Sequence, residues 1–300
     1  MILHNFASMR VDVGDVSIHL RHGGKGPPLL LLHGYPQSHV TWHAVADRLA
    51  QRYTLVMPDL RGYGDSSKPA GLPDHSNYSK RVMANDLIAV MRALGHESFH
   101  VCGHDRGGRV AHRLALDHPD AIKKLMLIDI SPTRTMYDKT DQTFATLYYH
   151  WFFLIQPQPL PETLIGASAA FYLNYTLGGW GSSGTDFFDK QALVEYARCF
   201  CTPEAIHSAC EDYRAAASID IAHDLDDVTK KLACPVRVLW GERGVVGRLF
   251  RPVADWQAVS ATQVTGTTLP AGHFIPEEVP GLLLDEMYAF FTEMPVVAAC

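Results

Sequence analysis

Short hydrophobic runs alternate with amphipathic stretches from the N-terminus to about residue 130. The hydrophobic runs are bounded by turn residues and predict strands at 16–21, 29–33, 53–57, 99–102 and 124–129, with the pattern returning at 236–240 and 262–264. Apolar positions at helical spacing predict helices over 42–50, 79–94, 107–118 and 282–292. This alternation is typical of an α/β protein with a mostly parallel sheet that helices cover on both faces.

The strand pattern stops between residues 133 and 226. Helical spacing replaces it, and aromatic side chains gather at Tyr148, Tyr149, Trp151, Phe152, Phe153, Phe171, Tyr172 and Tyr175. We therefore expect residues 1–132 and 227–300 to form an α/β core and residues 133–226 to form a helical cap (lid) domain inserted in it. Such a cap over the carboxyl ends of parallel strands would enclose a small chamber for a ligand.

Composition and charge exclude several classes of protein. With 47% hydrophobic and 19% charged residues, the chain is neither disordered nor fibrous. Its net charge is −6 and its basic residues form no stripe, which argues against a nucleic-acid partner. We expect no membrane partner and a cytoplasmic location, because the N-terminus lacks a basic segment followed by an apolar one.

The cysteines are expected to be reduced thiols, since a chain of this size does not need disulfides for stability. Cys199 and Cys201 lack a matching His or Cys pair at zinc-ligand spacing, so we expect no metal site. The six cysteines are Cys102, Cys199, Cys201, Cys210, Cys234 and Cys300.

The motif Gly103-His104-Asp105-Arg106-Gly107 stands between a predicted strand and a predicted helix. It has the form G-x-nucleophile-x-G, in which small residues allow a tight strand-to-helix turn. Asp105 occupies the nucleophile position. A carboxylate at a helix N-terminus stays ionised and can attack carbon without a base to activate it. The motif alone leaves open that Asp105 only caps the helix.

Two other segments have the residues that would complete this site. His33-Gly34-Tyr35-Pro36 follows an earlier strand, where the backbone N–H of Tyr35 can join that of Arg106 in an oxyanion hole. Gly272-His273-Phe274 precedes the last helix and supplies a histidine. The strand at 236–240 is followed only by Glu242, so Asp129, at the end of an earlier strand, is the better candidate for the acid that orients His273. A helix cap at Asp129 and a core histidine at 273 are the structural alternatives.

The elbow HDRGGR resembles that of the fluoroacetate (haloacetate) dehalogenases, a family of the α/β-hydrolase fold, and the resemblance extends over essentially the whole chain. It implies that the acid follows the strand ending at Asp129. It also implies that Arg106 and Arg109, three residues apart on one side of a helical turn, bind a substrate carboxylate. Without the resemblance, both arginines could be solvated helix residues.

The resemblance further implies a halide site in the cap. His150, Trp151 and Tyr213 would donate hydrogen bonds to the departing halide, because fluoride leaves only when its developing charge is stabilised. The alternative is that Trp151 and Tyr213 are cap core residues. No cofactor is implied. Relatives of this kind are often homodimers, and the aromatic surface of the cap is a candidate contact.

The implied activity is hydrolysis of a small haloacid, fluoroacetate to glycolate, through an ester on Asp105 that a His273-activated water hydrolyses. An epoxide hydrolase is the main alternative, since it shares the aspartate, the histidine and the cap. Arg106 argues against it, because tryptophan usually follows the nucleophile there. Paired cap tyrosines remain open among Tyr148, Tyr149, Tyr172 and Tyr213. A non-catalytic relative that binds a small acid is a further alternative.

Overall fold

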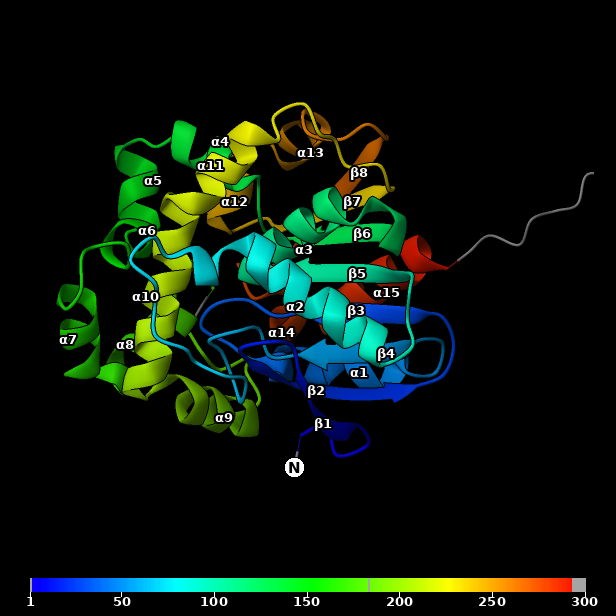
Figure 1. The fold of residues 1–300 in the computed structure, drawn as a ribbon, viewed down its shortest axis with the longest axis horizontal. Helices are drawn as coiled ribbons and strands as arrows, with labels where there is room; N and C mark the ends of the chain where they lie inside the picture. Colours follow the sequence, from blue (N-terminus) through cyan, green and yellow to red (C-terminus); the bar gives the residue numbers. More distant parts are fainter. Residues whose placement is uncertain (1, 183, 293–300) are drawn as a thin grey trace, which may run out of the picture.

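A computed structural model describes residues 2–182 and 184–292. Its central feature is an eight-stranded sheet with the strand order β1-β2-β4-β3-β5-β6-β7-β8 (Figure 1). Strands β3 to β8 are parallel, and β2 and β1 continue the sheet antiparallel at one edge. The bounds are β1 Ala7–Asp12, β2 Ser17–Gly24, β3 Pro28–Leu32, β4 Thr54–Pro58, β5 Phe99–His104, β6 Ile122–Ile128, β7 Val236–Gly241 and β8 Val264–Leu269.

Helices cover both faces of the sheet. Helices α2 and α3 lie in front of it in Figure 1, and α1 and α15 lie behind it. The helices outside the segment between β6 and β7 are α1 His43–Leu49, α2 Lys80–Ala93, α3 Arg106–Asp117, α12 Val245–Leu249, α13 Pro252–Gln257, α14 Ile275–Glu278 and α15 Pro280–Phe291, with the 3₁₀ helices η1 His39–Trp42, η2 Ser76–Tyr78 and η3 Pro119–Ala121.

The central strands alternate side chains between two hydrophobic clusters. In β3, Leu30 and Leu32 pack with α2 and α3, whereas Leu29 and Leu31 pack with α1 and α15. All four are fully buried. Because both faces are covered, β3 is apolar at every position rather than at every second one.

Eight helices follow β6 without an intervening strand among the described residues, and we call residues 133–226 the helical segment. They lie beside the ends of the central strands, at the left of Figure 1. Their bounds are α4 Thr133–Asp138, α5 Gln142–Leu147, α6 His150–Phe153, α7 Leu160–Gly166, α8 Ala169–Leu177, α9 Lys190–Phe200, α10 Pro203–Ala217 and α11 Ile219–Asp226.

The fold confirms the predicted α/β class, and the differences from the predicted elements have physical causes. Strand β1 was not predicted: Ala7, Met9 and Val11 alternate with polar residues, but nearly every residue of the strand is exposed and it contains no contiguous apolar run. The strand predicted at 262–264 is wrong in position: β8 begins at Val264, and its threonines and Gly266 hide it from a search for apolar runs. The helix predicted from residue 42 begins at His43, after η1.

Candidate active site

The turn between β5 and α3 holds Asp105 in a strained backbone conformation, with φ 47° and ψ −117°. A Cβ at Gly103 would lie 2.6 Å from the carbonyl oxygen of Gly107, and a Cβ at Gly107 would lie 2.3 Å from that of His33. Both positions therefore require glycine. The Asp105 side chain makes no capping bond to α3. Its Oδ2 instead accepts a hydrogen bond of 2.9 Å from the backbone N–H of Tyr35, in the loop after β3.

His273 and Asp129 form a buried pair beside Asp105. His273 Nδ1 donates to Asp129 Oδ2 at 2.6 Å, and Asp129 Oδ1 accepts from the Gly241 N–H at 3.0 Å. Nε2 of His273 is buried and has no hydrogen-bond partner among the described residues. Glu242, the other acid considered from the sequence, is exposed. The pair therefore fixes the imidazole tautomer with its unprotonated nitrogen available to a water molecule.

The local charges keep Asp105 ionised and His273 basic. Burial raises the pKa of Asp105, but the positive charges of His273, Arg106 and Arg109 outweigh it, and the pKa lies below its usual range. Burial lowers the pKa of His273, but its hydrogen bond to Asp129 and the charge of that residue outweigh this effect and raise the pKa overall. A carboxylate ready to attack and an imidazole ready to accept a proton are thus present together.

Arg106 is fully buried and is held by the helical segment. Its Nε and Nη2 donate to the carboxylate of Asp212, in α10, at 2.8 and 2.9 Å, and Nη2 also donates to the Asp212 carbonyl oxygen at 2.9 Å. Lys80 and Tyr63 bind the same carboxylate. Nη1 of Arg106 is buried and has no partner among the described residues. The guanidinium is therefore fixed, and its Nη1 group stays unpaired in the described structure.

Arg109 is also buried and fixed. Its Nη1 donates to the Ser131 carbonyl oxygen at 3.2 Å and to Thr133 Oγ1 at 2.9 Å, and its guanidinium lies 4.6 Å from the centre of the Trp151 ring. Its Nε lacks a partner in the described parts of the chain. Neither Arg106 nor Arg109 is a solvated helix residue, and each keeps one unsatisfied donor.

Side chains of the helical segment complete the wall around Asp105. The rings of His150 and Tyr213 lie 5.6 Å apart, those of Trp151 and Tyr213 6.5 Å apart, and the Arg106 guanidinium lies 4.2 Å from the Tyr213 ring. The hydroxyl of Tyr213 and Nδ1 of His150 are buried without partners in the described structure. The three residues considered for the halide site are thus brought together. Unsatisfied buried groups of this kind are uncommon and indicate a ligand position.

Two nearby residues, Trp180 and Asp212, were not identified from the sequence, and Tyr148 was named only among the cap tyrosines. Trp180 packs against His150 and His273, with ring centres 4.4 and 5.1 Å away, and also borders an outer cavity of about 470 Å³. The hydroxyl of Tyr148 is buried and unpaired among the described residues. Asp212 directly precedes Tyr213, yet only the fold shows that it binds Arg106. A tryptophan between glycines, as in residues 178–181, was the one available signal for Trp180.

The pairing of Asp212 predicts a large effect on stability. Asp212→Asn leaves the buried Arg106 without its counter-charge and leaves Lys80 with Asp220 alone, so we expect the free energy of unfolding to fall by about 3–5 kcal/mol. Asp138→Asn is the matched control, since Asp138 pairs with Arg134 at the surface, and there we expect a loss of about 1 kcal/mol or less. Urea unfolding of both variants measures the difference. Equal, small losses would contradict the structural role of Asp212.

One further cluster has metal-ligand chemistry. His19, His39 and Asp59 have ligand atoms within 4.8 Å of one another. Both imidazoles, however, donate Nδ1–H to the Asp59 carboxylate at 2.8 Å, and the same carboxylate accepts the backbone N–H groups of His39 and Asp65. These four bonds occupy the acceptor capacity of Asp59. The cluster thus braces the turn after β4.

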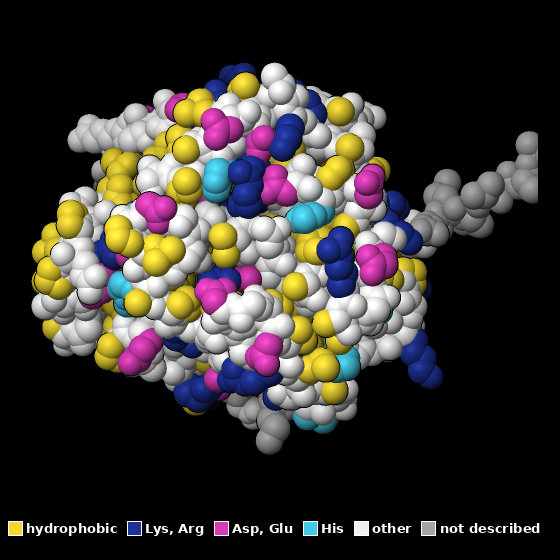
Figure 2. Space-filling model, viewed as in Figure 1, with side chains coloured by type: hydrophobic (Ala, Val, Ile, Leu, Met, Phe, Trp, Pro, Cys, Tyr) yellow, Lys and Arg dark blue, Asp and Glu magenta, His cyan; other side chains and the backbone are white. Residues whose placement is uncertain are grey.

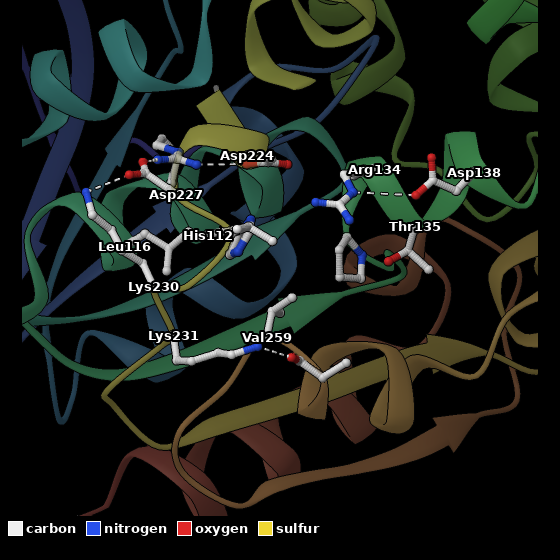
Figure 3. Close-up of a pocket in the computed structure, with 14 residues that line it drawn as sticks. His112, Leu116, Arg134, Thr135, Asp138, Asp224, Asp227, Lys230, Lys231 and Val259 are labelled. Carbon is white, nitrogen blue, oxygen red and sulfur yellow. Dashed lines mark hydrogen bonds and ion pairs between the residues drawn. The ribbon is translucent and has the colours of Figure 1, made fainter. Parts of the chain in front are cut away.

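A cavity of about 250 Å³ lies outside α3, away from Asp105 (Figure 3). Most of its charged side chains pair with one another: Arg113 with Asp224 and Asp227, Lys230 with Asp227, and Arg134 with Asp138. Lys231 donates to the Ala258 carbonyl oxygen. His112 lines it and packs edge-on against Trp256. Each of these cations thus has an ion-pair or hydrogen-bond partner among the described residues, unlike the unpaired donors of Arg106 and Arg109.

Comparisons with known proteins agree with this geometry. The model of the alpha/beta hydrolase fold family matches residues 27–200. The chain is 47% identical to a fluoroacetate dehalogenase from Burkholderia sp. over 93% of its length and 91% of the relative, and 33% identical to a soluble epoxide hydrolase from Corynebacterium sp. strain C12 over 94% and 96%. A crystal structure from Nostoc sp. PCC 7120, assigned to the alpha/beta hydrolases, superposes with a TM-score of 0.95 at 56% identity, covering 98% of this chain and all of that one.

Proposed function

Because the chain belongs to the α/β-hydrolase fold family, with a fluoroacetate dehalogenase among its relatives, we propose that it hydrolyses haloacetates, with fluoroacetate giving glycolate and fluoride. The observation that carries this proposal is the pair of unsatisfied buried donors, Nη1 of Arg106 and Nε of Arg109, next to an ionised Asp105. Two fixed cations select an anion. A neutral substrate would leave both donors unpaired, at a cost of about 1–3 kcal/mol each.

In the first step, the arginines hold the substrate carboxylate and direct its α-carbon at Asp105. Tyr35 N–H binds Oδ2, which leaves Oδ1 to attack. The new C–O bond forms as the C–halogen bond breaks, and its electron pair leaves with the halide. His150, Trp151 and Tyr213 surround the departing halide. Hydrogen bonds to this developing charge lower the barrier, and a poor leaving group such as fluoride needs them most.

In the second step, Nε2 of His273 takes a proton from water, and the hydroxide attacks Cγ of Asp105. The N–H groups of Tyr35 and Arg106 hold the resulting oxyanion, while Asp129 stabilises the imidazolium. The tetrahedral intermediate then breaks at the ester bond, and the proton on His273 passes to the glycolate oxygen. Haloacetate and water become glycolate, halide and a proton, and Asp105 is restored. Residues 133–226 act as the cap that excludes bulk water from these steps.

The test is product release from purified protein offered fluoroacetate, chloroacetate and a neutral epoxide side by side. We expect fluoride and chloride release and no diol. Release of chloride but not fluoride would support the aspartyl ester and the role of the two arginines, and it would contradict the proposed fluoride site. Tight binding of a haloacid without any turnover would indicate a small-acid-binding relative instead.

Epoxide hydrolysis is the second candidate, and a specific observation favours it. The hydroxyls of Tyr148 and Tyr213 are both buried and unpaired in the described structure, as two donors to an epoxide oxygen would be. Tyr172 is less suited, since its hydroxyl is hydrogen-bonded to both Tyr35 and Tyr149. Diol formation without halide release in the same assay would establish this candidate.

We also propose that the protein is a homodimer that forms through the helical segment. Large exposed apolar side chains support this, namely Leu160 and Leu164 in α7 and Phe171 and Tyr175 in α8. Helices α7 and α8 lie at the left of Figure 1, and hydrophobic side chains are exposed at the same edge in Figure 2. Phe171 is 70% exposed. Burial of such a patch favours association. Light scattering that gives the monomer mass at all concentrations would contradict it.

A cytoplasmic location is proposed from the cysteines. The five that the structure describes are free thiols, as a reducing compartment favours, and Cys300 lies outside the described residues. None of the described helices combines the length and apolarity of a membrane span. Recovery in the periplasmic or secreted fraction of the source cells would contradict this location.

A further inference from the structure

Three loops are in backbone contact beside His273. They are residues 181–182 of the helical segment, 241–244 after β7 and 271–274, which carry His273. A Cβ at Gly272 would lie 2.6 Å from both the Gly181 carbonyl carbon and the Ser182 nitrogen. A Cβ at Gly241 would lie 2.0 Å from the Gly272 carbonyl oxygen. The position of the loop that carries the histidine thus depends on the other two loops.

One carboxylate connects these loops. Glu278, the last residue of α14, has a side chain that is only 6% exposed. Its Oε2 accepts from the Gly272 N–H at 2.8 Å and from Nη2 of Arg243 at 3.1 Å, and its Oε1 accepts from the Phe274 N–H at 3.1 Å and from Ser182 Oγ at 3.0 Å. Glu278 therefore holds the backbone N–H groups on both sides of His273.

We propose that Glu278 is a positioning residue for His273, and that through Ser182 it makes the alignment of this histidine depend on the seating of the loop 181–182 of the helical segment. The inference rests on the proposed role of His273 in ester hydrolysis. It assigns Glu278 to the second chemical step alone, because none of its hydrogen bonds involves Asp105, Arg106 or Arg109.

The geometry requires a carboxylate at this position. Two backbone N–H groups, a hydroxyl and a guanidinium converge on it, and all of them are donors. A carboxylate offers two acceptor oxygens, whereas an amide offers one acceptor and an NH₂ group that would oppose a donor. In Glu278→Gln, at least one of the two N–H groups that flank His273 loses its partner.

The charge of Glu278 gives a second, independent readout. The charged groups that face His273 are Asp129, Asp105 and Glu278, and the neighbouring titratable groups are His104, Tyr148 and His150. Burial lowers the pKa of His273, Asp129 raises it most, and Glu278 raises it further. Removal of the Glu278 charge lowers the pKa of His273, so the acid limb of the ester-hydrolysis rate shifts to lower pH.

The experiment compares Glu278→Gln with wild type and with Glu286→Gln. Glu286 is the matched control, because it also pairs with an arginine, Arg237, but this arginine lies near the start of β7. With chloroacetate, rapid mixing measures the halide burst, and mass spectrometry measures decay of the protein ester. We expect Glu278→Gln to keep the burst within about twofold and to slow ester decay by about 10- to 100-fold, as small misplacements of a catalytic group do. Its acid limb shifts to lower pH, and Glu286→Gln behaves as wild type.

Several outcomes would overturn the proposal. Ester decay at the wild-type rate, or slowed decay with an unshifted acid limb, would show that Glu278 does not position the histidine. Equal loss of burst and decay in a folded variant would show an effect on the whole site.

If Glu278→Gln does not fold, Ser182→Ala keeps the carboxylate and tests the link to the helical segment. We expect this variant to slow ester decay roughly 2- to 10-fold. Decay at the wild-type rate would contradict the link. Should the protein open epoxides instead, diol formation passes through the same ester, so the comparison remains valid when the haloacetate assignment fails.

Discussion

Asp105→Asn should abolish halide release, with a loss of about 10⁴- to 10⁶-fold in turnover. The carboxamide has no ionised oxygen to attack carbon, and no neighbouring group can replace it, because His273 Nε2 serves water and both arginines are cations. The fold should persist, since the amide oxygen can still accept the Tyr35 N–H. An ion-selective electrode measures halide, and circular dichroism checks the fold.

Binding by the same variant separates chemistry from recognition. Replacement of Asp105 by asparagine removes the repulsion between its negative charge and the substrate carboxylate, while Arg106 and Arg109 keep their unpaired donors. Fluoroacetate should therefore still raise the melting temperature of Asp105→Asn. Arg109→Leu in the same background should lose that shift. Halide release by Asp105→Asn above the buffer rate would refute the nucleophile assignment.

His273→Asn should separate the two steps of the reaction. One equivalent of halide should appear per site, and the protein should then gain the mass of one carboxymethyl group and stall. Steady-state turnover should fall by at least about 10³-fold, because water then attacks the ester without a base. Intact-protein mass spectrometry after a single mixing detects the ester. If this variant releases no halide and forms no ester, His273 acts in the first step instead.

The pH dependence of the wild type should show the same separation. Asp105 has a lowered pKa and stays ionised well into the acid range, so the halide burst should persist there. His273 must be neutral to accept a proton, and its pKa is raised by the bond to Asp129. As the pH falls through that raised value, ester hydrolysis should slow while the burst remains. Esterified protein should therefore accumulate at a pH of about 6.

The local parts of this site were predictable from the sequence, and the long-range parts were not. The elbow around Asp105 is a contiguous motif whose glycines are fixed by backbone contacts, so its pattern indicates its structure. The interaction of Asp212 with Arg106 joins residues far apart in the chain and has no periodicity or spacing. For the same reason, no pattern showed that Arg106 is already paired and offers only one donor to a ligand.

The strands show the same contrast. Buried strands such as β3 are contiguous apolar runs and were placed within a residue or two. The edge strand β1 and the threonine-rich β8 are held by backbone hydrogen bonds to one neighbour each, which impose little on the side chains. Sequence patterns reveal burial, and these strands have little of it.

The place of Asp129 under His273 also constrains how such a site can change by descent. The loop after β7 is the other place considered for this acid, and Gly244 lies in it. A side chain at Gly244 would begin 3.3 Å from Asp129 Oδ1, so the two positions share one space under the histidine. A lineage that moves its acid from one loop to the other would crowd two carboxylates into this space if it held both at once. If it held neither, His273 would have no acid to orient it. The order of the two substitutions therefore matters, and the glycine keeps the alternative position vacant.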